Sequence, residues 1–275
     1  MLMVVSMAMF AVEDVFLKSA ALHLPLGQVM VTMGLCGMAV FAVMARRRGE
    51  VALPRAVLAP AMLARSASEV AGRLFYALAV ALTPLSTASA ILQATPLVVI
   101  AGAAMIFGER VSPSRWAAVG VGFVGVLMIV QPGIQGFSAM SLLAVAGMLG
   151  FAGRDLATRA APRTLSNRQL GTLGFAMLAV AGALILVWTG GARLPDATAA
   201  LQVAGTTGFG IAGYHALTAA MRTGQVSAVT PFRYTRLICA LILAALVFHE
   251  RPDMLTLAGA ALIVAAGIYG LTRRR

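Results

Sequence analysis

The sequence predicts an all-α polytopic membrane protein, with ten transmembrane helices arranged as two inverted five-helix repeats around a central cavity. Composition is the first reason. Hydrophobic residues make up 60% of the 275 residues and charged residues only 11%, whereas a soluble domain carries roughly a quarter charged residues. Water offers no way to bury so much apolar surface, so the surrounding solvent must be largely lipid. The second reason is that one long apolar segment recurs later in the chain.

The repeated segment runs from Phe75 to Pro132 and again from Tyr214 to Gly270. Each copy contains an apolar helix, a short turn, a second apolar helix, a Glu-Arg turn and a third apolar helix. Duplication of this kind is typical of polytopic transporters. We expect a first repeat in residues 1–136 and a second in residues 137–275. The matching positions are Phe75–Leu78 with Tyr214–Leu217, Ser86 with Ser227, and Gly108–Arg110 with His249–Arg251.

Ten segments are long enough to span a bilayer, which takes about 20 apolar residues per helix. Proline and glycine mark the turns between them. Charged residues interrupt the third and the sixth segment, but the repeat supports the third because its partner is clearly apolar. The segments are residues 3–21, 26–45, 59–82, 86–107, 113–131, 138–157, 169–189, 199–221, 227–248 and 254–272.

Arginine and lysine in the short loops predict the orientation, because cytoplasmic loops carry an excess of them. With the N-terminus inside, fourteen basic residues fall on the cytoplasmic side and three on the outer side. Both termini are therefore expected in the cytoplasm, and five helices per half make the halves inverted. The fourteen are Arg46, Arg47, Arg48, Arg55, Arg110, Arg115, Arg154, Arg159, Arg163, Arg168, Arg222, Arg273, Arg274 and Arg275; the three are Lys18, Arg193 and Arg251.

The first helix carries two adjacent carboxylates near its middle, Glu13 and Asp14. Charge inside a membrane is costly and marks function or pairing. Asp14 and Lys18 are four residues apart and can form an ion pair on one helix face. Glu13 has no such local partner, which makes it the better candidate for a proton or substrate site.

Arginines on the third and ninth helices form two further charged stripes. Arg65, Glu69 and Arg73 recur every four residues, so Glu69 can bridge both arginines. Arg233 and Arg236 share one face of the ninth helix, beside Tyr234. Two interpretations stay open for this pair. It can pack against Glu69, Asp14 or Glu13, or it can bind a carboxylate or phosphate of a substrate.

One histidine also lies within an apolar segment. His215 follows Tyr214, in the repeat position that corresponds to Tyr76. A lone histidine in such surroundings is usually just hydrogen-bonded, but with a carboxylate nearby it can titrate near neutral pH. We expect His215 and Tyr76 to help gate the cavity or orient its ligand.

Several classes of function find no support in the sequence. The basic residues are scattered between apolar segments, which argues against nucleic-acid binding despite the net charge of +12. Cys36 and Cys239 lie deep in apolar segments and are interpreted as packing residues. No metal cluster, phosphate-binding glycine loop or convergent catalytic set is recognisable, so we expect no metal, no cofactor and no enzymatic activity. Met1 leads straight into the first membrane helix, without a cleavable leader pattern.

The segment from Pro84 to Gly133, and Thr230–Tyr234 before the second Glu-Arg turn, resemble the EamA repeat of the bacterial drug/metabolite transporter superfamily. The resemblance covers both repeats. It implies ten helices, cytoplasmic termini, the bacterial inner membrane, and a cavity lined mainly by helices one, three, four, six, eight and nine. Four-helix multidrug members use a first-helix carboxylate for proton and cation binding, which makes Glu13 or Asp14 a counterpart here.

We therefore expect a secondary transporter, and an exporter, of small polar metabolites such as amino acids or derivatives, working by alternating access. Arg233, Arg236 and Arg73 would hold an anionic group, while Glu13 or Asp14 would bind a proton or an amine. The alternative is a proton-coupled exporter of multiple drugs or cationic compounds, although the arginines in the core count against lipophilic cations. A passive channel is a further possibility. The expected partners are a small metabolite and the lipid bilayer, and both a monomer and a homodimer remain open.

Overall fold

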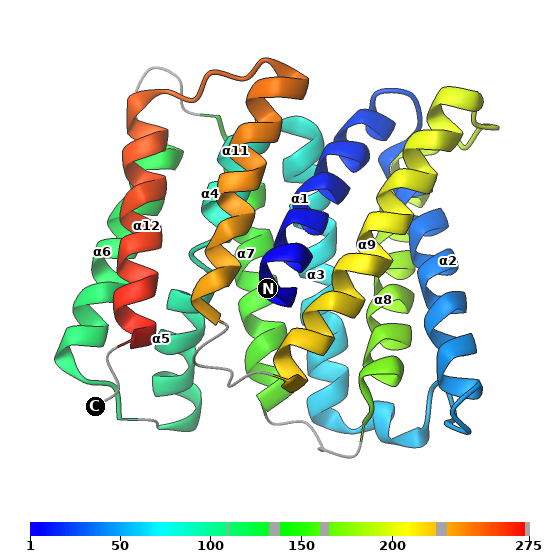
Figure 1. Ribbon diagram of the computed structural model, residues 1–275, viewed down its shortest axis with the longest axis horizontal. Helices are drawn as coiled ribbons and strands as arrows, with labels where there is room; N and C mark the ends of the chain where they lie inside the picture. The colour runs from blue at the N-terminus through cyan, green and yellow to red at the C-terminus, as the bar shows by residue number, and fades with distance from the viewer. Residues whose placement is uncertain (109, 132–137, 160–164, 224–229, 273–275) are drawn as a thin grey trace.

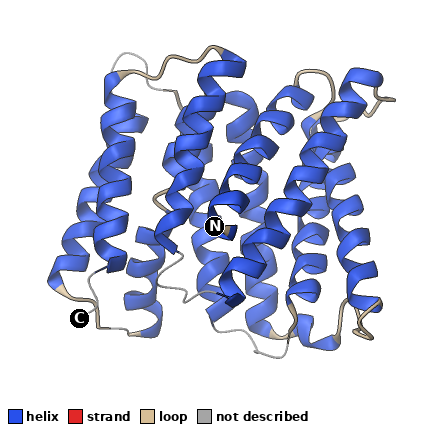
Figure 2. Ribbon diagram, viewed as in Figure 1, coloured by secondary structure: helices blue, strands red, loops and turns tan. Residues whose placement is uncertain are grey.

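The structure is a computed structural model that describes residues 1–108, 110–131, 138–159, 165–223 and 230–272. Helix is the only regular secondary structure that Figure 2 shows for these residues. The helices match the ten expected segments closely: α1 (Leu2–Ala21), α2 (Leu26–Arg46), α3 (Pro60–Leu82), α4 (Leu85–Leu92), α5 (Thr95–Phe107), α6 (Pro113–Val130), α7 (Ser141–Arg159), α8 (Asn167–Thr189), α9 (Ala197–Thr223), α11 (Thr235–Phe248) and α12 (Met254–Thr272), with short 3₁₀ helices η1 (Arg55–Leu58) and η2 (Thr230–Tyr234).

The expected fourth helix is divided into α4 and α5, which corrects the prediction of one continuous segment over residues 86–107. Proline lacks a backbone N–H and its ring crowds the carbonyl four residues earlier, so Pro96 disturbs the helix at Leu92. The Thr95 hydroxyl donates to the Leu92 carbonyl at 2.5 Å instead. In the second half, η2 contains Pro231 and precedes α11, so the same helix of each repeat changes geometry in mid-course.

The closest helix pairs each join the first half of the chain to the second. They are α2 with α8, α6 with α12, α3 with α7, and α1 with α9. In the two repeats α1 corresponds to α7, α2 to α8, α3 to α9 and α6 to α12. When the halves are exchanged, the α3–α7 pair becomes the α9–α1 pair, and the α2–α8 and α6–α12 pairs are unchanged. The packing therefore follows a pseudo-two-fold axis. Consecutive helices alternate in direction, and α7 therefore runs opposite to α1 (Figure 1). The repeat positions Glu109 and Ser227 lie outside the described residues.

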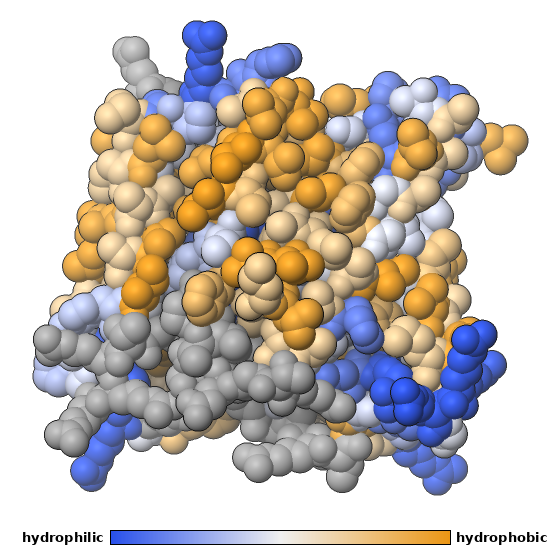
Figure 3. Space-filling model, in the orientation of Figure 1, coloured by the Kyte–Doolittle hydropathy of each residue, from blue (hydrophilic) through white to orange (hydrophobic). Residues whose placement is uncertain are grey.

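The surface has the polarity of a membrane protein. On the face shown in Figure 3, hydrophobic residues cover the middle of the molecule, and hydrophilic residues gather mainly toward its upper and lower edges. Four described segments are long and apolar enough to cross a bilayer: Leu26–Arg46, Leu85–Phe107, Pro113–Val130 and Asn167–Thr189. Three of the remaining helices, α1, α3 and α7, carry several charged residues, and most of those whose side chains the structure describes line the cavity described next.

Candidate functional site

A cavity of about 420 Å³ lies between the two halves of the chain. Its volume is in the range of small-molecule sites. Side chains from α1, α3, the α4–α5 junction, α7, α9 and η2–α11 line it, which are helices one, three, four, six, eight and nine in chain order; α2 and α8 also contribute. The polar and charged lining residues are Glu13, Asp14, Arg65, Arg73, Tyr76, Gln93, Thr95, Arg154, Asp155, Thr158, Asn167, Tyr214, Thr218, Arg233, Tyr234 and Arg236.

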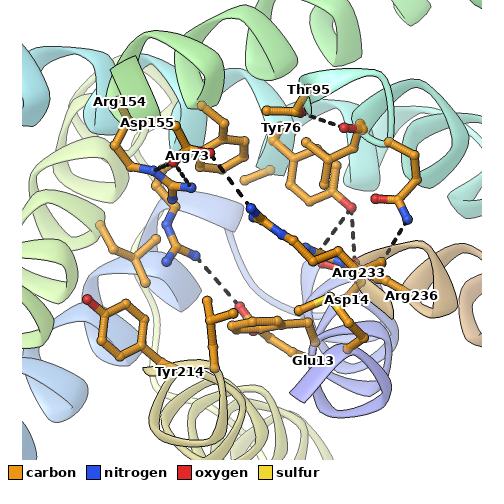
Figure 4. Close-up of a pocket in the computed structure, with 18 of the residues that line it drawn as sticks. Glu13, Asp14, Arg73, Tyr76, Thr95, Arg154, Asp155, Tyr214, Arg233 and Arg236 are labelled. Atoms are coloured by element: carbon orange, nitrogen blue, oxygen red, sulfur yellow. Dashed lines mark hydrogen bonds and ion pairs between the residues drawn. The ribbon is translucent and has the colours of Figure 1, made fainter. Parts of the chain in front are cut away.

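Asp14 anchors the first of two charged clusters. Its carboxylate Oδ2 accepts from Arg236 Nη2 at 2.7 Å and from the Tyr76 hydroxyl at 3.0 Å. Arg236 also lies over the rings of Phe10 and Tyr76, at 5.3 and 5.5 Å from the centroids. The cluster joins α1 and α3 of the first half to α11 of the second (Figure 4). Asp14 and Arg236 are thus mutually neutralised.

This pairing corrects the expectation that Asp14 neutralises itself with Lys18 on the same helix. Lys18 instead lies 3.2 Å from Glu250 of the α11–α12 turn. The two residues do lie four positions apart on one helix, but Asp14 binds Arg236 of α11 and Lys18 binds Glu250 of the turn that follows it. Of the two interpretations of the ninth-helix arginines, packing against Asp14 describes Arg236.

Glu69 anchors the second cluster, where it is shared by three guanidinium groups. Arg65, Arg73 and Arg154 approach its carboxylate within 3.2, 3.4 and 3.4 Å. The prediction that Glu69 bridges Arg65 and Arg73 along α3 is therefore confirmed. Arg154 adds a third partner from α7 and also binds its neighbour Asp155 at 2.8 Å.

Glu13 and Arg233 each make one long ion pair with a member of the Glu69 cluster. Arg73 lies 3.8 Å from Glu13, and Arg233 lies 3.9 Å from Asp155. Figure 4 shows both arginines reaching across the cavity toward these carboxylates. Glu13 is 5% exposed, and its Oε2 has no hydrogen-bond partner within the described ranges. Arg233 has the more exposed side chain, at 31%. These two groups therefore have longer ion pairs than the members of the two clusters.

A hydrogen bond connects the α4–α5 break to the segment that carries Arg233. The Gln93 side chain, at the end of α4, donates to the Arg233 backbone carbonyl at 3.1 Å. The two mid-course irregularities of the repeats are thus joined to each other beside the cavity. Discontinuous helices at mid-membrane are common at substrate sites of transporters, because they leave backbone groups free to bind.

Most, but not all, of the residues predicted for a site line this cavity. Glu13, Asp14, Arg73, Tyr76, Arg233, Tyr234 and Arg236 all line the cavity. His215 does not: it is exposed on α9, and its neighbour Tyr214 lines the cavity instead.

Arg154 and Asp155 were missed as site residues, and Arg154 was counted with a cytoplasmic loop although it lies within α7. Adjacent opposite charges in an apolar segment were the available signal. Gln93, Thr95 and Phe151 gave none.

Among the described residues, no group of three or more His, Cys, Asp or Glu could hold a metal ion. The described lining offers a ligand guanidinium, carboxylate, hydroxyl, amide and ring groups. Hydrogen bonds between charged groups are stronger than neutral ones. The site can bind a small polar compound that carries charge of either or both signs.

Comparison with known proteins places the chain. A pseudopaline exporter of Pseudomonas aeruginosa is 30% identical over 270 residues, which cover 94% of this chain and 90% of the relative. A riboflavin transporter of Rhizobium johnstonii is 31% identical, over 69% of this chain and 62% of its own length. An S-adenosylmethionine uptake transporter of Rickettsia prowazekii is 26% identical, over 68% and 63%. The matched region thus spans just under two thirds of the latter two relatives.

A solved crystal structure, described only as that of a protein, superimposes with a TM-score of 0.64 at 20% identity, covering 98% of this chain and 96% of its own. At that identity the likeness shows the fold alone. These relatives are named as transporters and not as enzymes. The EamA-like transporter family matches residues 1–131 and 138–273, nearly the whole sequence. The chain belongs to the EamA-like transporter family.

Proposed function

We propose that this protein is a secondary transporter that exports small polar metabolites bearing a carboxylate or phosphate, such as amino acids or their derivatives, by alternating access. The observation that carries the proposal is the charge of the cavity. Five arginines line it, and four carboxylates line it or lie directly behind it, so one positive charge is left over. A ligand with one net negative charge would balance the site.

Arg233 is the proposed anchor for the anionic group. Arg236 is held at 2.7 Å by Asp14, whereas Arg233 has only a 3.9 Å approach to Asp155. A guanidinium can hold a carboxylate or phosphate through two parallel hydrogen bonds. Arg73, which approaches Glu13 at 3.8 Å, is a second contact for the same group. Arg236 then acts by positioning Tyr76 and Asp14.

Glu13 is the proposed site for a proton or for an amino group of the ligand. Its buried carboxylate has one oxygen without a hydrogen-bond partner in the described part of the chain. Asp14, the other candidate, is already engaged by Arg236 and Tyr76. We therefore assign this role to Glu13 alone.

The relatives support metabolite transport and are divided on direction. One is named an exporter and another an uptake transporter, and the exporter matches over nearly the whole chain. Export from the cytoplasm is proposed on that basis, in the bacterial inner membrane with both termini inside. The excess of arginine in the loops on one side supports this orientation.

Thermal unfolding of the detergent-purified full chain tests the proposal. A ligand raises the unfolding temperature in proportion to the logarithm of its concentration over its Kd, so weak ligands register at high concentration. Amino acids, dicarboxylates, nucleotides and organic cations form the panel. We expect stabilisation by anionic or zwitterionic compounds, weakened about tenfold or more in apparent Kd by Arg233→Gln.

Arg193→Gln is the matched control, because Arg193 lies exposed in the α8–α9 loop and its side chain binds the His23 carbonyl. Its ligand response should equal that of the unmodified chain. Stabilisation only by organic cations, lost in Glu13→Gln, would overturn the anionic-substrate proposal and favour a multidrug or cation exporter.

A further inference from the structure

The carboxylate of Glu250 caps a helix to which it is not connected in sequence. Glu250 lies in the turn between α11 and α12, and it accepts from the backbone N–H groups of Leu85 and Ser86 at 2.7 and 3.0 Å. It also accepts from the Ser86 hydroxyl at 2.7 Å. Leu85 and Ser86 are the first residues of α4, where N–H groups have no partner within the helix. A carboxylate at this end is favourable for the helix dipole as well.

Lys18 ties the end of α1 to the same point. Its ammonium lies 3.2 Å from Glu250 Oε1 and donates to the Thr83 carbonyl, in the α3–α4 turn, at 2.6 Å. It also lies over the ring of Phe248, 5.1 Å from the centroid. Lys18 and Glu250 come from opposite halves of the chain, and their side chains are only 15% and 13% exposed. We call Lys18, Ser86 and Glu250 the latch.

The latch lies toward one end of the cavity. Leu17, next to Lys18, is a lining residue. At the opposite end the lining reaches Thr158, one residue from the end of α7, and Asn167, the first residue of α8. The α1, α4 and α11 helices pack together at the latched end, which is uppermost in Figure 1. This end of the cavity therefore faces the side of the α3–α4 and α11–α12 turns, where the three helices pack together.

Glu250 remains charged while it holds this position. Burial raises its pKa, but the hydrogen bonds from the Ser86 and Leu85 amides and the Ser86 hydroxyl, together with the Lys18 charge, outweigh burial and leave the pKa lowered. The contact is thus made at neutral pH by a few short, charge-assisted hydrogen bonds between separate segments.

We propose that Lys18, Ser86 and Glu250 form a latch that closes this end of the cavity and that opens when the transporter exposes its substrate on that side. The inference rests on the proposed alternating access, in which a site opens to each side in turn. Weakening the latch shifts the population toward the state that is open at this end.

The test is the chemical accessibility of Leu17→Cys in a full chain that also carries Cys36→Ser and Cys239→Ser. Spheroplasts and inverted vesicles present opposite sides to a membrane-impermeant maleimide. We expect Glu250→Gln to speed labelling from the α11–α12 side about tenfold, equivalent to about 1.4 kcal/mol. Labelling from the other side should slow. Lys18→Met removes the ion pair but keeps the cap on α4, so it should give a smaller change in the same direction.

Asp253→Asn is the matched control. Asp253 lies in the same turn, but it binds Gln131 and the backbone N–H of Thr256, both away from the latch. The labelling rate of Leu17→Cys in this variant should stay within about twofold of the rate in the chain without Asp253→Asn.

Unchanged labelling in Glu250→Gln and Lys18→Met, or an equal rise from both sides, would overturn the latch. If Glu250→Gln does not accumulate, Lys18→Met decides alone. A one-sided rise without any anionic ligand in the stabilisation assay would keep the latch and remove the proposed substrate class.

Discussion

The α2–α8 and α3–α7 pairs pack in the same way but differ completely in charge. In α2–α8, a Cβ at Gly27 would lie 2.4 Å from the Leu186 backbone nitrogen. In α3–α7, a Cβ at Gly150 would lie 2.4 Å from the Gly72 nitrogen. Both crossings thus depend on glycine to bring two backbones together, as membrane helices commonly do.

The charges separate the two pairs. In α2 and α8 the charged residues are Arg46, at the end of one helix, and Arg168, near the start of the other. The α3–α7 pair carries Arg65, Glu69, Arg73, Arg154 and Asp155 inside it. Because α2–α8 forms without internal charge, charge is not required to hold two helices of this chain together. Intramembrane charge is costly, so the charges of α3–α7 indicate function.

Removing the Glu69 carboxylate, which three arginines share, should lower stability more than the glycine and arginine substitutions in these two helix pairs. Glu69→Gln leaves Arg65, Arg73 and Arg154 without the group that balances them. Breaking buried ion pairs by removing one partner costs about 3–5 kcal/mol, and thermal unfolding of the purified chain measures it. Glu50→Gln is the control, since Glu50 binds Arg168 at the more exposed end of α8. It should lose about 1 kcal/mol or less. Equal losses would show that the interior charges are no more constrained than the surface ones.

Substitutions at the glycines of the two helix crossings should lower stability by an intermediate amount. Gly27→Ala and Gly150→Ala each force a methyl group against backbone atoms that cannot rotate away. We expect each to lower stability by about 1–3 kcal/mol, as overpacking does. The same unfolding experiment applies. If only one of the two substitutions destabilises the chain, the crossings are not equivalent and the comparison of their charges fails.

The sequence was sufficient to predict an interaction when both residues lie in the same helix. The Glu69 stripe was predicted because its α3 partners follow helical spacing, and the ten segments were predicted because each apolar length is local. Asp14 with Lys18 had the same spacing, yet both side chains bind groups more than 200 residues away in sequence. Spacing shows which pairs are possible, and tertiary contacts decide between them.

Two further differences have physical causes. His215 and Tyr214 are adjacent, but neighbours on a helix point about 100° apart, and here Tyr214 lines the cavity whereas His215 is exposed. The repeat alignment matched Tyr76 to His215, but the residue that lines the cavity is the neighbouring Tyr214, which aligns with Phe75. The interruption between α4 and α5 could have been predicted from Pro96. The membrane orientation and the roles of the site residues remain predictions.

Arg73→Gln should weaken ligand binding while it changes the stability of the chain only slightly. Glu69 keeps Arg65 and Arg154 at 3.2 and 3.4 Å, so we expect a loss of only about 1 kcal/mol. The same substitution removes the 3.8 Å approach to Glu13 and the second anion contact. The apparent Kd of an anionic ligand should rise about tenfold in the stabilisation assay. A loss as large as that of Glu69→Gln, with an unchanged Kd, would make Arg73 structural.

Gly174→Ala should have the smallest effect and the opposite sign. Gly174 lies within α8, but a Cβ there would meet no atom within 4 Å. Alanine is favoured over glycine in a helix interior by up to about 1 kcal/mol, so the unfolding temperature should rise slightly. A stability gain at Gly174, set beside stability losses at Gly27 and Gly150, would show that glycine is needed only where two helix backbones approach closely. A loss at Gly174 similar to that at Gly27 would mean that α8 tolerates no added side chain, and the destabilisation at Gly27 would then say nothing specific about its crossing with Leu186.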